Sequence, residues 1–132
     1  MTISWGENMI EIGLDTVEIS RIEKAMKNKN FLNFILGEEE YDFFGKKGFP
    51  LQSVAANFCC KEAFSKSIST GFRNFNFRNV QILRNELGKP FFIFSGNALK
   101  IVKENKYKFS LSITHTKNYA TAVVICFKEE NL

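Results

Sequence analysis

Glu62 and Lys66 lie one helical turn apart in a segment that is otherwise mostly apolar. Projected at about 100° per residue, the apolar residues from Val54 to Ile68 cover nearly the whole circumference, which is typical of a centrally buried helix. Glu62 falls among the apolar residues on that projection. A carboxylate in such a position must be paired, metal-bound or neutralised, because an isolated buried charge is strongly unfavourable.

Two interpretations of this pair are open. An i,i+4 pair of Glu62 and Lys66 on an exposed face would contribute only about 0.2–0.5 kcal/mol. A second carboxylate would favour a Mg²⁺ site, which takes one or two carboxylates and completes its shell with water and substrate phosphates. Asp15 is the candidate, since it follows the strand-like run Met9 to Leu14. The residues alone favour a helix N-cap for Asp15, with Glu18 three positions later approximating a capping box.

A third segment, Ser110 to Lys117, is rich in hydroxyl groups and contains His115, the only histidine of the chain. It lies between two strand-like runs and is expected to form the end of a hairpin. Its hydroxyls and backbone N–H groups, with Lys117 and His115, are suited to an anionic ligand. An ordinary polar turn with a solvated histidine fits the same residues.

Taken in order, these segments resemble the holo-acyl-carrier-protein synthase family, the small class of 4'-phosphopantetheinyl transferases. The opening pattern of that family, Gly-x-Asp-x-x-x-Ile-x-Arg, corresponds to Gly13 to Arg21, and its Lys-Glu-Ala-Phe-Ser-Lys signature corresponds to Lys61 to Lys66. Its Gly-Lys-Pro turn is present at Gly88 to Pro90, and its Ser-x-Ser/Thr-His-Thr end at Ser112 to Thr116. The resemblance spans residues 9 to 127.

The resemblance implies transfer of the phosphopantetheine arm of coenzyme A to a serine of an acyl carrier protein of fatty acid synthesis. Catalysis would rest on positioning and electrostatics at the pyrophosphate. Asp15 and Glu62 would hold Mg²⁺, and Lys66 would neutralise the phosphates or protonate the leaving group. The general base stays open between a metal-bound water and Glu62. Further contacts with coenzyme A would come from Ser65, Lys66, Pro90, Thr114, His115 and Thr116.

The resemblance also implies partners. A chain of this size is expected to be one transferase domain, 1–132, that self-associates, by resemblance as a homotrimer with its sites between subunits. Acyl carrier proteins are acidic, and the chain carries 18 Lys and Arg against 14 Asp and Glu, a net charge of +4. Arg21 and Lys24 are therefore expected to dock the carrier protein and to guide its encounter.

One residue departs from the family pattern. The family commonly has Arg four residues before the signature lysine, and this chain has Asn57 there. The departure predicts weaker binding at the nucleotide end of coenzyme A unless Lys46, Lys47 or Lys61 replaces the charge.

Composition excludes several other classes. The 15 phenylalanines occur mostly in apolar runs, and no RNA-binding signature accompanies the basic charge, so a nucleic-acid partner is not expected. The three cysteines show no zinc spacing and are typical of reduced cytosolic thiols. The longest apolar run, Ala122 to Phe127, is far below membrane-spanning length, and no leader is recognisable. We expect a soluble, cytoplasmic protein.

The periodicities predict an α+β fold with an antiparallel sheet and a long central helix. The central helix is expected to begin near Ser53, after Pro50, and to end before Gly71. The other expected helices are Val17–Lys27, Phe31–Leu36, Glu38–Phe44 and Gly96–Glu104, and the expected strands are Met9–Leu14, Asn79–Arg84, Phe91–Phe94, Lys108–Ile113 and Tyr119–Phe127.

Two alternative functions fit the same residues. The first is a transferase for carrier domains of polyketide or peptide synthases, because the surface of the partner decides that choice. The second is a non-catalytic coenzyme A-binding module, against which the presence of Asp15, Glu62 and Lys66 argues.

Overall fold

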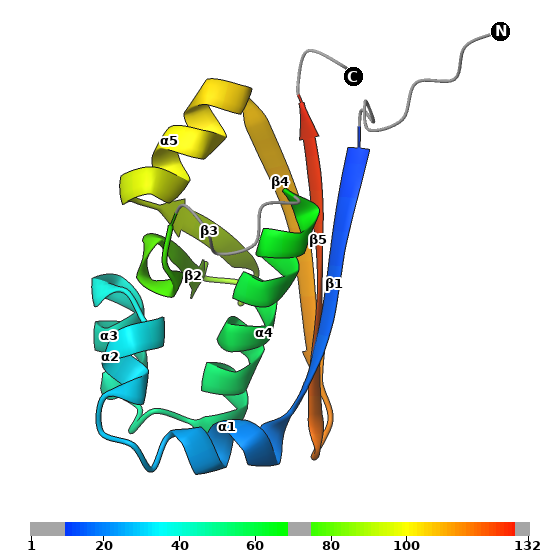
Figure 1. Ribbon diagram of the computed structural model, residues 1–132. Coiled ribbons are helices and arrows are strands. Elements are labelled where there is room, and N and C mark those ends of the chain that lie inside the picture. The colour runs from blue at the N-terminus through cyan, green and yellow to red at the C-terminus, as the bar shows by residue number, and fades with distance from the viewer. Residues whose placement is uncertain (1–9, 69–74, 129–132) are drawn as a thin grey trace, which may run out of the picture.

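The computed structural model describes residues 10–68 and 75–128, which form two antiparallel sheets and five α-helices (Figure 1). The α+β architecture predicted from the sequence is confirmed. In chain order the elements are β1 (Ile10–Glu18), α1 (Ile19–Ala25), α2 (Phe31–Ile35), α3 (Glu38–Gly45), α4 (Leu51–Ser67), the 3-10 helix η1 (Phe77–Asn79), β2 (Val80–Arg84), β3 (Pro90–Phe94), α5 (Gly96–Asn105), β4 (Tyr107–His115) and β5 (Tyr119–Lys128).

The larger sheet has the strand order β1-β5-β4, and both of its pairings are antiparallel. Its register places Asp15, Ala122 and Ile113 in one row, and Thr16, Thr121 and Thr114 in the next. The smaller sheet is the β2–β3 hairpin, in which Arg84 faces Pro90 at the turn end. Because side chains alternate between the two faces of a strand, neighbouring rows point to opposite sides of the sheet.

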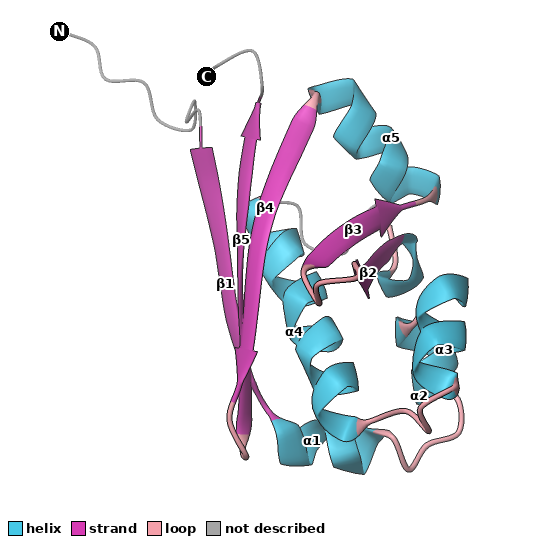
Figure 2. Ribbon diagram, turned by 180° about the vertical axis from the view of Figure 1, so that it is seen from behind, coloured by secondary structure: helices cyan, strands magenta, loops and turns pink. Residues whose placement is uncertain are grey.

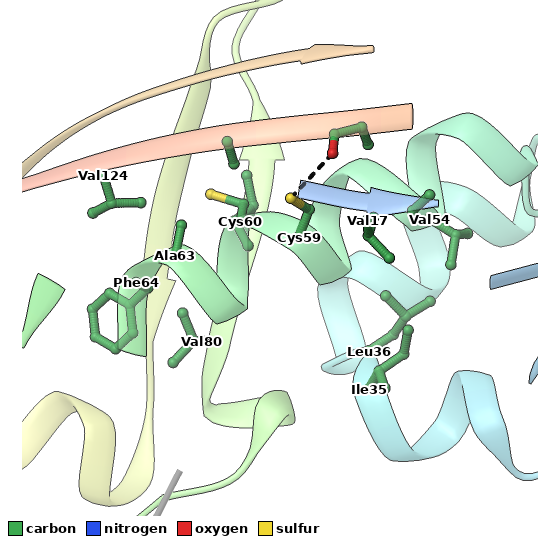
Figure 3. Packing of buried hydrophobic residues seen from close by; sticks show 14 of the residues in the cluster. Val17, Ile35, Leu36, Val54, Cys59, Cys60, Ala63, Phe64, Val80 and Val124 are labelled. Atoms are coloured by element: carbon green, nitrogen blue, oxygen red, sulfur yellow. Dashed lines mark hydrogen bonds between the residues drawn. The ribbon is translucent and has the colours of Figure 1, made fainter. Parts of the chain in front are cut away.

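Helix α4 lies along one face of the larger sheet, with α2 and α3 on the side of α4 away from that sheet (Figures 1 and 2). Its apolar side chains point in several directions, as the projection predicts, and Cys59, Ala63 and Phe64 are fully buried (Figure 3). The ring of Phe64 packs against Phe109 at a centroid distance of 5.1 Å. The central buried helix expected from the sequence is therefore confirmed.

The boundary between β1 and α1 differs from the prediction. Strand β1 continues to Glu18, four residues beyond the expected end at Leu14, and α1 begins at Ile19. Val17, which fits the apolar stripe of a helix, instead points into the core as a strand residue and is 4% exposed. Strand pairing with β5 decides the outcome, because its register continues to Glu18 opposite Tyr119.

The other predicted boundaries agree to within a few residues. Helix α4 begins at Leu51, directly after Pro50, and ends at Ser67. The predicted stop before Gly71 and the strand start at Met9 lie outside the described residues.

The face of the larger sheet opposite α4 is covered by no other element of the described chain (Figure 2). Three large apolar side chains of β1 point from this face, with exposed fractions of 50% for Ile10, 63% for Ile12 and 58% for Leu14. Among residues 10–68 and 75–128, no helix combines the length and apolar character needed to cross a membrane.

Candidate active site

Asp15 lies in β1, where its carboxylate faces α4. Lys66 of α4 donates from Nζ to Asp15 Oδ1 at 2.9 Å and to the backbone oxygen of Leu14 at 3.1 Å. The Asp15 side chain is 19% exposed and the Lys66 side chain 54%. The helix N-cap expected for Asp15 is wrong, because Glu18 stands at the cap position of α1 and provides no side-chain cap.

Close approach of α4 to β1 is possible because residue 13 is glycine. A Cβ atom at Gly13 would lie 1.8 Å from the backbone oxygen of Ala63 and 2.7 Å from the backbone nitrogen of Ser67. No larger residue fits between these two backbones without moving one of them. The glycine thereby allows the charged face of α4 to lie against Asp15, two residues further along β1.

Glu62 is half-buried on the same side of α4. Within the described chain its carboxylate has no hydrogen bond and no ion pair, so the simple i,i+4 pair with Lys66 is not formed. Burial raises the pKa of Glu62, and the negative charge of Asp15 raises it further, while Lys66 lowers it. The pKa of Lys66 is itself raised, mainly by its hydrogen bond to Asp15. Two carboxylates and one ammonium group therefore meet where α4 crosses β1.

The donor set fits a divalent cation that keeps water and substrate ligands. Two carboxylates whose negative charges repel each other are stabilised by a dication between them, and one of the two, Glu62, has no partner within the described residues. No group of three or more His, Cys, Asp or Glu side chains suited to a metal ion occurs in the described part of the chain. A closed protein cage is thus not formed here, whereas the two-carboxylate arrangement that Mg²⁺ accepts is present.

Cys59 of α4 contacts Asp15 of β1, and the sequence did not indicate this contact. Its thiol donates to the backbone oxygen of Asp15 at 3.1 Å, and its sulfur is 3.7 Å from Asp15 Oδ2. Burial raises the pKa of Cys59 to about 12, and the charge of Asp15 contributes to the shift. The group therefore stays protonated at neutral pH and acts as a small donor within the core. The dashed line in Figure 3 marks another of its contacts, with the backbone oxygen of Ala120 at 3.5 Å.

A second polar cluster on the far side of α4 was also missed. Glu40 and Lys61 are both fully buried and form an ion pair at 2.7 Å. Lys61 Nζ also donates to the backbone oxygens of Ile35 at 2.6 Å and Phe77 at 2.8 Å. Lys61 therefore cannot supply a charge to bound coenzyme A. The sequence signal was a lysine within a buried helix together with the acidic start of α3.

Ser65 and Pro90 lie on different elements, α4 and β3. The Ser65 side chain is buried, and its hydroxyl donates to the backbone oxygen of Glu62 at 2.7 Å. Pro90 begins β3 in the smaller sheet. The contacts of both residues with coenzyme A stay predictions.

The hairpin end that carries Thr114, His115 and Thr116 is exposed. It is closed by the backbone nitrogen of Thr116, which donates to the oxygen of Tyr119 at 2.8 Å. His115 lies two strands away from Asp15 and two rows further along, which corresponds to roughly 12 Å between Cα atoms for the usual strand spacings. Thr114 points to the opposite face of the sheet. One chain therefore does not bring these residues to the two carboxylates.

Arg21 and Lys24 are exposed on α1, above the buried residues Ile19 and Ile22. Helix α1, which also exposes Glu23, lies at one end of the larger sheet, close to the β4–β5 turn (Figure 1). This placement is compatible with the predicted docking role.

Comparison with known proteins identifies the family. Residues 11–124 match the 4'-phosphopantetheinyl transferase superfamily. A holo-[acyl-carrier-protein] synthase of Fusobacterium nucleatum is 40% identical over 119 residues, which cover 89% of this chain and 98% of the relative. One from Clostridium beijerinckii is 41% identical over 118 residues, which cover 89% of this chain and 96% of the relative.

Comparison with solved structures supports the same family. The holo-[acyl-carrier-protein] synthase of Neisseria meningitidis superposes with a TM-score of 0.84 at 34% identity, covering 89% of this chain and 98% of that one. The enzyme of Bacillus anthracis, solved in complex with CoA (3',5'-ADP), gives a TM-score of 0.76 at 34% identity, covering 92% of this chain and all of that one. The chain belongs to the holo-[acyl-carrier-protein] synthase family of the 4'-phosphopantetheinyl transferase superfamily.

Proposed function

We propose that the chain transfers the 4'-phosphopantetheine arm of coenzyme A to a serine of an apo acyl carrier protein. The serine oxygen bonds to the pantetheine-side phosphorus, the bond from that phosphorus to the bridging oxygen breaks, and adenosine 3',5'-bisphosphate leaves. The observation that carries the proposal is the meeting of Asp15, Glu62 and Lys66 at the crossing of α4 and β1. The relatives named as synthases, and the coenzyme A bound in their structures, support it.

Lys66 is suited to bind the pyrophosphate. Its ammonium group has three N–H donors, of which two are used by Asp15 and Leu14. The third donor remains for a phosphate oxygen on the exposed side of the residue. Because its pKa is raised, Lys66 keeps its positive charge at neutral pH. The charge neutralises the phosphates and stabilises the leaving group.

Asp15 and Glu62 are the residues that would hold Mg²⁺. When bound, Mg²⁺ neutralises negative charge on the pyrophosphate oxygens. We also assign to Glu62 the role of accepting the serine proton; its carboxylate has no partner within the described chain, and burial and the charge of Asp15 raise its pKa, which support this role.

We further propose that coenzyme A binds between copies of the chain. The sheet register places His115 two strands away from Asp15 and turns Thr114 to the opposite face, which supports contacts with the same phosphates from two copies. On the outer face of the larger sheet, β1 and β5 present a contiguous apolar surface that a second copy would cover. Its rows pair Ile10 with Phe127, Ile12 with Ile125, and Leu14 with Val123. A homotrimer is the assembly expected from the family resemblance.

We propose that the protein acts in the cytoplasm, where both of its proposed substrates, coenzyme A and the acyl carrier protein, would be present. Carrier-protein docking is assigned to Arg21 and Lys24, which act mainly on encounter and orientation.

The test is intact-mass analysis of an apo acyl carrier protein incubated with the chain, coenzyme A and Mg²⁺. The expected result is a gain of one phosphopantetheine arm, which is lost with EDTA and with Glu62→Gln. Glu104→Gln, which removes an exposed carboxylate from α5, is the matched control and should retain transfer. Binding of coenzyme A without any mass gain on several carrier proteins would contradict the proposal and support a non-catalytic binding module.

A further inference from the structure

Arg84, the last residue of β2, holds a partly buried guanidinium group that forms no ion pair with a carboxylate of the described residues. Its Nη2 donates to Asn57 Oδ1 at 3.1 Å, and its Nη1 reaches the backbone oxygen of Leu83 at 3.5 Å. Both acceptors are uncharged. Within residues 10–68 and 75–128, none of the ion pairs closer than 4.0 Å involves Arg84.

Asn57 fixes the orientation of this guanidinium. The amide is fully buried, and its Nδ2 donates to Glu40 Oε2 at 2.7 Å and to the backbone oxygen of Ile82 at 2.9 Å. With both N–H groups used, Oδ1 is the remaining polar atom, and it points to Arg84. A rigid buried amide therefore holds one edge of the guanidinium.

The local charge is unbalanced. Glu40 and Lys61 cancel each other in their buried pair, and Arg84 adds one positive charge beside them. Burial lowers the pKa of Arg84, and the nearby charges of Cys60 and Glu40 act in the opposite direction. A guanidinium nevertheless stays charged at neutral pH. Of its five N–H donors, two are used by Asn57 and Leu83. The remaining donors suit an oxyanion.

The position of Arg84 separates it from the pyrophosphate site. Asn57 and Glu62 are five residues apart on α4, which corresponds to about 140° around the helix axis and about 7.5 Å along it. A pyrophosphate held by Asp15, Glu62 and Lys66 of one chain is therefore out of reach of Arg84 in that chain. The proposed substrate has one further anionic group, the phosphate monoester on the 3' position of its ribose.

We infer that Arg84, oriented by Asn57, binds the 3'-phosphate of coenzyme A and makes the enzyme selective for coenzyme A over dephospho-coenzyme A. The inference rests on the proposed function, because it names the part of that substrate which Arg84 recognises. It also assigns a role to Asn57 in place of the family's arginine: the amide holds a guanidinium that comes from another element.

The kinetic test compares coenzyme A with dephospho-coenzyme A, which lacks the 3'-phosphate. Loss of one charge-assisted contact in Arg84→Gln should raise the KM for coenzyme A about tenfold to a hundredfold, with little change in kcat. The KM for dephospho-coenzyme A should change by less than about twofold. Arg78→Gln removes the same charge from the exposed face of η1 and should leave both KM values unchanged. An equal rise for both substrates, or none, would overturn the inference.

A binding test separates failure of the inference from failure of the proposed function. Calorimetry with adenosine 3',5'-bisphosphate and with adenosine 5'-monophosphate needs no turnover. Tighter binding of the bisphosphate by the wild type, lost in Arg84→Gln, supports the inference even where no carrier protein is modified. Equal binding of both nucleotides by the wild type refutes it. If Arg84→Gln does not fold, Arg84→Lys replaces it and should weaken bisphosphate binding alone, because lysine lacks the planar fork.

Discussion

Replacement of Lys61 by methionine is expected to destabilise the fold through the buried charge that it leaves behind. Glu40 is fully buried and would lose the one ion pair that it forms within the described residues, while keeping hydrogen bonds from the backbone of Gly37 and Ile82 and from Asn57. Breaking a buried ion pair costs about 3–5 kcal/mol. For a chain of 132 residues, an unfolding entropy of roughly 2.1 cal/mol/K per residue converts this loss into a fall of about 11–18 °C in Tm.

Calorimetric melting of Lys61→Met measures this change. Lys100→Met is the matched control, because Lys100 pairs with Glu104 at 4.0 Å on an exposed face and should shift Tm by less than about 2 °C. The double variant Glu40→Gln/Lys61→Met should melt higher than Lys61→Met, since its buried carboxylate is removed. A fall of less than about 4 °C in Lys61→Met, or a double variant no more stable than it, would refute the reasoning.

Three further outcomes follow from the site. Gly13→Ala should lower transfer activity and Tm together, because the new Cβ meets the backbone of Ala63 at 1.8 Å; retention of both in activity and melting assays would contradict the close approach. With its pKa raised to about 12, Cys59 should resist iodoacetamide at pH 8 in the folded protein and react after denaturation, as peptide mass mapping would show. The fold raises the pKa of Glu62 above its ordinary value of 4.5. Its contribution to stability is therefore fully present below pH 4.5 and is lost as the pH rises through the pKa of the folded state. Without Mg²⁺, Tm should therefore fall more between pH 4 and pH 7 in the wild type than in Glu62→Gln, and parallel profiles would contradict this.

The elements with one clear periodicity could be predicted from the sequence. The buried helix α4 was found because apolar residues surround its axis, and its start followed from Pro50. The end of β1 could not be found in this way. Residues 15–18 fit both a strand and the first turn of a helix, and pairing with β5, a contact distant in sequence, selects the strand.

The candidate site was predictable only in part. Glu62 and Lys66 were found because charges are rare in a buried helix, and Asp15 because family resemblance joined it to them. The contact of Cys59 with Asp15 and that of Asn57 with Arg84 depend on which side chains face each other after folding. No spacing along the chain encodes such contacts, because they join residues that are distant in sequence.

The two polar clusters on α4 depend on each other through the helix. Rotation of α4 by one residue position, about 100°, would carry Glu62 away from Asp15. The same rotation would withdraw the Lys61 ammonium from Glu40 and from two backbone oxygens, at the cost expected for a broken buried pair. Sliding of α4 along β1 is limited by the contact at Gly13. The buried pair and the glycine contact together therefore hold Glu62 and Lys66 toward Asp15, although neither the Glu40–Lys61 pair nor Gly13 provides a group to the reaction.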